Sequence, residues 1–345
     1  MRSIYGKYEV IILLVMGALL SWGTTGLVRQ YALKRSVMDI PNERSSHSVP
    51  TPRGGGIAIV LTFLLGAAAL YSTGRLSITF MVACCGAGAL IAAIGFLDDH
   101  GHIPALWRLL GHFGAAIWAL VWLGGMPPIE LFGIAFSLGW AGHVLAVLYL
   151  VWLLNLYNFM DGIDGIASVE AISVCLGACL LYLINGQSSL VFAPLLLAAV
   201  VAGFLIWNFP PAKIFMGDAG SGFLGIVLGI LSLQAARHAL EFFWAWLILL
   251  GVFIVDATFT LLRRLLRGDR VYEAHRSHGY QYASRRFGSH QTVTLAVAVI
   301  NVVWLLPLAV GVVMNWLPGV AGLALAYGPL VMVAIRYHAG ELERL

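Results

Sequence analysis

Long apolar runs separated by short polar segments follow one another along the whole chain. A helix needs about 20 mostly apolar residues to cross a bilayer, and eleven stretches of roughly this length can be marked. The pattern therefore predicts an all-α fold, a polytopic membrane helix bundle with about eleven transmembrane helices. The expected helices are residues 10–29, 54–71, 77–97, 106–124, 140–157, 167–184, 190–207, 219–236, 241–262, 292–314 and 317–335.

The composition supports a membrane location for most of the chain. Of 345 residues, 60% are hydrophobic and only 10% are charged, whereas a soluble globular domain averages about 25% charged residues. We therefore expect a single integral-membrane domain over residues 1–345 and no soluble domain. The four cysteines all lie in apolar runs without metal-site spacing, so we interpret them as packing residues. The expected polar loops lie near 30–53, 98–105, 158–166, 208–218 and 263–291.

Lysine and arginine indicate the orientation, because they concentrate on the cytoplasmic side of membrane proteins. With the N-terminus placed outside, 16 of the 20 basic residues fall on the cytoplasmic side, and only Arg2, Lys7, Arg75 and Arg237 stay outside. The acidic and amide residues at the helix ends fall on the same cytoplasmic side, although the count did not use them. We expect a periplasmic N-terminus, a cytoplasmic C-terminus and a functional site that faces the cytoplasm.

Two separate acidic motifs suit a metal ion. Asp98 and Asp99 end the third apolar run, and paired carboxylates of this kind attract a hard cation such as Mg²⁺. The alternative is an exposed helix-end pair on a solvated loop. The run Phe215–Gly222 places Asp218 among glycines at the start of the eighth helix, where free N–H groups can bind anions. The alternative there is a plain helix N-cap.

The most specific pattern is the recurrence of Asn155, Asn158, Asp161 and Asp164 at every third position. On a helix this spacing places the four side chains along one slowly rotating stripe. Amides and carboxylates together suit recognition of a nucleotide base and ribose, and they can order water around a metal ion. A polar helix cap would need one such residue rather than four.

The basic loop 263–291 carries His275, Arg276 and His278. Cations of this kind suit phosphate oxygens, and we expect the three side chains to face the substrate. The alternative is an anchor that meets anionic lipid head groups, and both can hold. Asp256, inside the ninth apolar run, is either a functional intramembrane carboxylate or one half of a structural ion pair with a bundle arginine.

The stretch 39–56 before the second helix is rich in proline and ends in three glycines. Its proline content is too high for a helix, so we expect a cytoplasmic substrate loop that brings His47 and Arg53 to the site. The alternative is a plain linker.

Together these motifs resemble the polyprenyl-phosphate N-acetylhexosamine-1-phosphate transferases, the superfamily of MraY and WecA, over nearly the whole chain. The last loop has fewer histidines than the MraY branch and is similar to the O-antigen-initiating WbpL subgroup on the WecA side. The resemblance implies Mg²⁺, with Mn²⁺ as a substitute, a UDP-sugar donor, undecaprenyl phosphate as acceptor, and the bacterial inner membrane. It rests on Asp98-Asp99, on Asn155-x-x-Asn158-x-x-Asp161-Gly-x-Asp164-Gly165, on Asn208 with Gly217-Asp218-x-Gly220-Ser221, and on Asp39-x-Pro41-Asn42-x-Arg44 with His47.

The resemblance predicts that an N-acetylamino sugar 1-phosphate moves from a UDP-sugar to undecaprenyl phosphate, releasing UMP and starting O-antigen or another cell-envelope polysaccharide. Asp98, Asp99 and Asp218 are the expected catalytic residues: Asp218 and Asp98 would hold the metal, and Asp99 or Asp98 would keep the lipid phosphate deprotonated. Direct attack and a covalent aspartyl intermediate both stay open. The expected substrate-binding residues are Asn155, Asn158, Asp161, Asp164, Asn208, Phe215, His275, Arg276, His278, His47 and Arg53.

Three other hypotheses about the function remain. An MraY-type phospho-muramyl-pentapeptide transferase would catalyse the same class of reaction with a bulkier donor. A secondary transporter should carry ionisable residues near the bilayer midplane on broken helices, whereas this chain gathers them at one side. A non-catalytic scaffold would not need four acidic or amide clusters on that side. We expect no nucleic-acid partner, and a homodimer stays open.

Overall fold

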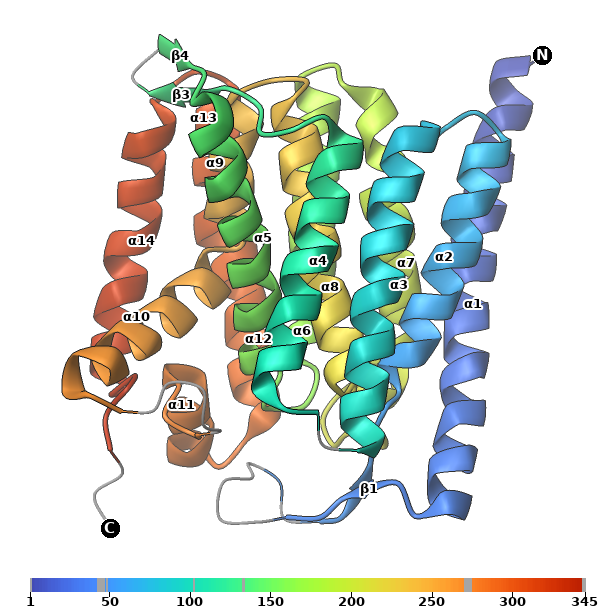
Figure 1. Cartoon of the computed structure of the whole chain (residues 1–345), viewed down its shortest axis with the longest axis vertical. Helices are drawn as coiled ribbons and strands as arrows, with labels where there is room; N and C mark the ends of the chain where they lie inside the picture. Colours follow the sequence, from blue (N-terminus) through green and yellow to red (C-terminus); the bar gives the residue numbers. More distant parts are fainter. Residues whose placement is uncertain are drawn as a thin grey trace.

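The computed structural model describes residues 2–41, 47, 49–101, 103–131, 134–269 and 275–342. Long helices run side by side between two ends of the molecule, with the N-terminus at one end and the C-terminus at the other (Figure 1). The chain is 76% helical with almost no sheet, which confirms the all-α prediction.

Nine helical segments of the described chain are long and apolar enough to cross a membrane. Another apolar helix, α2 (Gly56–Ser72), is slightly shorter at 17 residues. The nine segments are α1 (Arg2–Arg35), α3 (Ile78–His100), α4 (Ala105–Leu123), α5 (Gly139–Met160), α6 (Ile166–Ile184), η1 (Ser188–Val191) with α7 (Phe192–Asn208), α8 (Asp218–Ala236), α12 (His290–Ile300) with η2 (Asn301–Leu305) and α13 (Leu306–Val313), and α14 (Gly319–Arg336).

The ninth expected helix, over residues 241–262, is present but broken. The structure has α9 (Glu241–Leu249) and α10 (Gly251–Arg267), which are bent by 72° relative to each other. In Figure 1, α10 crosses the bundle obliquely. The polar side chains Asp256 and Arg264 of α10 pair with protein groups, as intramembrane ionisable residues usually do.

The centre of the bundle is α8, which packs against α3 and α5 and whose residues are nearly all buried. Glycines allow this close approach. A Cβ atom on Gly95 of α3 would come within 2.5 Å of the backbone of Asp218 and Ala219 at the start of α8. The α3–α8 contact therefore brings the end of α3, with its two aspartates, directly against the N-terminus of α8.

A short β-hairpin lies at each end of the bundle. β1 (Met38–Asp39) pairs antiparallel with β2 (Thr51–Pro52), and β3 (Ile129–Leu131) pairs with β4 (Ile134–Phe136) at the opposite end (Figure 1). The first hairpin is attached to the segment before α8, because Phe215 N donates to Pro52 O at 2.8 Å. Asp39 and Arg53 are thereby held at the end of the bundle where α3 ends and α8 begins.

Candidate active site

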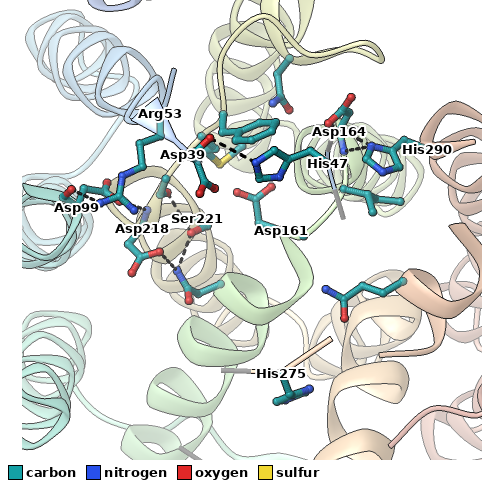
Figure 2. A pocket seen from close by; sticks show the side chains of 18 residues that line it. Asp39, His47, Arg53, Asp99, Asp161, Asp164, Asp218, Ser221, His275 and His290 are labelled. Carbon is teal, nitrogen blue, oxygen red and sulfur yellow. Dashed lines mark hydrogen bonds and ion pairs between the residues drawn. The ribbon is translucent and has the colours of Figure 1, made fainter. Parts of the chain in front are cut away.

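A cavity of about 390 Å³ lies at this end of the bundle, among α5, α8 and the loops around them (Figure 2). It collects ten of the fourteen residues expected from the sequence. Those that do not line it are Asp98, Asn155, Arg276 and His278. The ten that do are His47, Arg53, Asp99, Asn158, Asp161, Asp164, Asn208, Phe215, Asp218 and His275.

The start of α8 and the end of α3 form the acidic wall of the cavity. Asn158 Nδ2 donates to Asp218 Oδ1 at 3.0 Å and to Ser221 Oγ at 2.8 Å. Asp218 N donates to Asp99 Oδ1 at 3.4 Å. Asp99 Oδ2 is buried and has no hydrogen-bond partner among the described residues. A Cβ atom on Gly217 would come within 2.7 Å of this oxygen, so only glycine leaves room for it.

Asp98 points toward α4 instead of into the main cavity. Its Oδ1 accepts the backbone N–H of Ile103 at 2.9 Å, and its Oδ2 forms an ion pair with Arg108. Arg108 Nη1 also lies 3.8 Å from Asp218 Oδ2. Asp98 was expected to hold the metal with Asp218, but its carboxylate is already engaged by Ile103 and Arg108. The unpartnered carboxylate oxygen belongs to Asp99 instead. A second, small cavity of about 30 Å³ is lined here by polar side chains of Asp98, Arg108, His112, Asn155, Asn158 and Asp218.

The donor set at the acidic wall fits Mg²⁺. This ion is usually bound by one or two carboxylates and completes its shell with waters or phosphate oxygens. Asp99 and Asp218 meet here, because Asp218 N donates to Asp99 Oδ1, and Asp99 adds an unpartnered buried oxygen. An ion held by two carboxylates would leave positions in its shell open for substrate.

Asp161 adds a further carboxylate to the same cavity. Burial, and then the negative charges of Asp218, Asp164 and Asp99, raise the pKa of Asp161 well above its usual range. A divalent cation or a cationic partner would relieve this repulsion. Relief of this repulsion is a second reason to expect a cation in the cavity.

Asp164 holds three segments together at the edge of the cavity. Its Oδ2 accepts from Ala212 N at 3.0 Å, and its Oδ1 lies 3.2 Å from His290 Nδ1. Its backbone oxygen accepts from Thr294 Oγ1 at 2.9 Å. The structure therefore gives Asp164 a positioning role between the α5–α6 loop, the segment before α8 and the start of α12.

Asn208 and Phe215 lie on the segment between α7 and α8. Both ends of the Asn208 amide bind backbone: Oδ1 accepts from Gly165 N at 3.1 Å, and Nδ2 donates to Ile214 O at 3.0 Å. Phe215 meets the ring of His47 edge to face, with 4.8 Å between centroids. This aromatic pair offers a flat surface on which a base can stack.

The loop before α11 (Gly279–Phe287) differs most from expectation. His278 is only 2% exposed, and its Nδ1 lies 3.2 Å from Asp256 Oδ1. Asp256 also accepts the N–H groups of Gly279 and Tyr280, at 3.0 and 2.9 Å. The structure thus corrects two expectations: His278 does not face the cavity, and the partner of Asp256 is the start of α11 instead of an arginine. The physical reason is that free N–H groups at a helix start need an acceptor.

Arg276, the middle residue of the same loop, does not line the cavity either. Its backbone oxygen accepts from Arg285 Nη2 at 3.3 Å, so the structure uses its main chain to position α11.

Sequence reasoning did not select several polar residues of the two cavities. Arg108 and His290 each lie at or near the start of a long apolar run, and an ionisable residue in such a run is a signal for function. Ser221 belongs to a glycine-rich motif already identified, so its neighbour Asp218 could have drawn attention to it. Gln281 carries no local signal, because only the folding of α11 against the α5–α6 loop brings it to the cavity.

Comparisons with known proteins show what the chain is similar to. Residues 79–236 match the family model described as glycosyl transferase family 4. The chain is 31% identical to a probable undecaprenyl-phosphate N-acetylglucosaminyl 1-phosphate transferase of Bacillus subtilis, over 86% of this chain and 83% of the relative. It is 30% identical to a decaprenyl-phosphate N-acetylglucosaminephosphotransferase of Mycolicibacterium smegmatis, over 81% and 77%. A phospho-N-acetylmuramoyl-pentapeptide-transferase of Moorella thermoacetica is 30% identical over 64% and 72%.

Proposed function

Because the chain belongs to the polyprenyl-phosphate N-acetylhexosamine-1-phosphate transferase family, we propose that it transfers an N-acetylamino sugar 1-phosphate from a UDP-sugar to undecaprenyl phosphate. UMP is released, and the lipid-linked sugar initiates an O-antigen or another cell-envelope polysaccharide. The general reaction is that of the relatives, which are polyprenyl-phosphate sugar-phosphate transferases. The donor nucleotide, the sugar and the metal are the proposed details.

The observation that carries the proposal is the meeting of Asp99 and Asp218 at the end of the bundle, with a buried carboxylate oxygen left unpartnered. Mg²⁺, or Mn²⁺ in its place, would be held by these two residues and would neutralise the donor diphosphate. Phosphoryl transfer depends mostly on positioning and charge neutralisation. A wall of this chemistry is therefore what a nucleotide diphosphate requires.

The remaining residues divide between the two substrates. We assign the base to the face of Phe215 and His47, and the donor phosphates to the region between Arg53 and Asp218. The acceptor phosphate would approach from the α4 side, where Arg108 bridges Asp98 and Asp218. Arg108 would attract the phosphate, and its positive charge would favour the deprotonated form that attacks.

The location proposed for the site is the cytoplasmic face of the bacterial inner membrane. The sequence supports it, since the expected topology assigns 16 of the 20 basic residues to the cytoplasmic side. UDP-sugars are made in the cytoplasm, so a site on this face could reach its donor directly.

The test is transfer of radiolabel from UDP-N-acetylglucosamine to undecaprenyl phosphate by membranes that contain the protein. Transfer should stop with a chelator, return with Mg²⁺ or Mn²⁺, and be abolished in Asp218→Asn. Transfer at the full rate in chelator would refute the metal role. Equal use of UDP-muramyl-pentapeptide would favour the alternative suggested by the muramyl-pentapeptide relatives.

A further inference from the structure

The cavity has one wall without charged side chains. His275 and Gln281, which flank the start of α11, are the described residues of this segment that line it. The charged groups Asp99, Asp218 and Arg53 gather in another part of the cavity, away from His275 (Figure 2). A substrate with a charged half and a neutral half would therefore place its neutral half against α11.

Gln281 directs an unused donor group into this region. The side chain is 6% exposed, and its Oε1 accepts the backbone N–H of His278 at 3.4 Å. Its Nε2 has no hydrogen-bond partner in the part of the chain that the structure describes. Gly162 makes room for this amide, since a Cβ atom there would come within 2.8 Å of Nε2. Nε2 is not among the fully buried unpartnered atoms of the described residues, so it is accessible from the cavity and can donate to an acceptor on a ligand.

His275 presents a second neutral donor from the same segment. Its Nδ1 lies 3.3 Å from Ser277 N and 2.9 Å from Ser277 Oγ. Because a backbone N–H can only donate, Nδ1 must accept, and the ring proton of the neutral imidazole is on Nε2. Burial, and then the neighbouring His278, lower the pKa of His275 to about 3. The ring is therefore neutral at physiological pH.

We infer that Gln281, with His275 beside it on the same wall, selects an N-acetylamino sugar by donating a hydrogen bond from Nε2 to the acetamido carbonyl oxygen of the donor. The inference rests on the proposed function. Neutral N–H donors match a neutral carbonyl, whereas the phosphates of the donor need cations. The nucleotide base needs a flat face, which Phe215 offers. The sugar is therefore the part of the donor that would contact α11.

The frame around Gln281 is rigid, as selection by a single hydrogen bond requires. Asp256 accepts from Gly279 N and Tyr280 N, and it also contacts His278. Tyr280 Oη donates to Phe159 O at 3.0 Å, which fastens α11 to the end of α5. His278 is thus a positioning residue that holds the first turn of α11, and Gln281 is the residue that meets the sugar.

Two substitutions separate the two roles of Gln281. Gln281→Glu keeps an oxygen to accept from His278 N but removes the N–H donors, and Gln281→Met removes both without adding charge. Inhibition constants of UDP-N-acetylglucosamine, UDP-glucose and UMP would be measured for each purified variant, together with its thermal unfolding. Gln291→Met is the matched control, since Gln291 is exposed on α12 and does not line the cavity.

We expect both Gln281 variants to bind UDP-N-acetylglucosamine roughly tenfold more weakly, the effect of one lost hydrogen bond. Affinity for UDP-glucose, which lacks the acetamido group, and for UMP should stay unchanged. Equal weakening of all three ligands, or no change for any of them, would overturn the inference. Absence of transfer from every UDP-sugar by the wild-type protein would instead refute the proposed function, independently of the variants.

Discussion

Gly95→Ala tests whether the α3–α8 contact sets the geometry of the site. Gly95 lies one turn before Asp98 and Asp99, and an added Cβ atom would come within 2.5 Å of Ala219 N and of the carbonyl carbon of Asp218. Ordinary contacts begin at 3.4 Å, so the two backbones must separate by about 0.9 Å. Neither backbone can rotate away as a side chain could. Overpacking of this kind costs about 1–3 kcal/mol of stability.

The effect on catalysis should be larger than the effect on folding. A misplacement of about 1 Å between reacting groups can cost roughly 10²-fold in rate, and here it moves Asp99 relative to Asp218. The assay is the transfer rate at saturating donor with thermal unfolding measured in parallel. Gly114→Ala on α4 is the control, because its Cβ atom would meet nothing within 4 Å. A Gly95→Ala protein with the wild-type rate, or a control that is equally impaired, would refute the reasoning.

Two further predictions concern topology and pH. Reporter fusions after Gly101 and Gly165 should show a cytoplasmic location, and a fusion after Asn185 should show a periplasmic one. An inverted pattern would refute both the topology and the location of the site. The pKa of His275 is lowered to about 3 in the folded protein, whereas an unfolded histidine binds its proton below about pH 6.5. Because only the unfolded chain binds this proton between these two values, the free energy of unfolding should decline as pH falls from 6.5 toward 3. The unfolding temperature should depend less on pH in His275→Gln than in the wild-type protein between about pH 7 and 5. The same pH dependence in both proteins would contradict the prediction.

Local features of the sequence were enough to predict much of this protein. Hydropathy depends only on neighbouring residues and on the thickness of the bilayer, so ten of the eleven apolar runs appear as continuous helical segments near the expected positions. The spacing of Asn158 and Asp161 and the motif around Asp218 likewise identified residues that the fold brings to one cavity. Such motifs are readable because each is contained in one short segment.

The tertiary structure alone decided which atoms meet. Asp98 and Asp99 are equivalent in the sequence, yet Arg108 engages one, while the other keeps a free oxygen beside Asp218, 119 residues away. His278 is a second example, because its contact with Asp256 of α10 keeps it out of the cavity. These choices depend on the distance of closest approach between helices and on which donors remain unpaired after packing. Both are properties of the assembled bundle, and no local pattern encodes them.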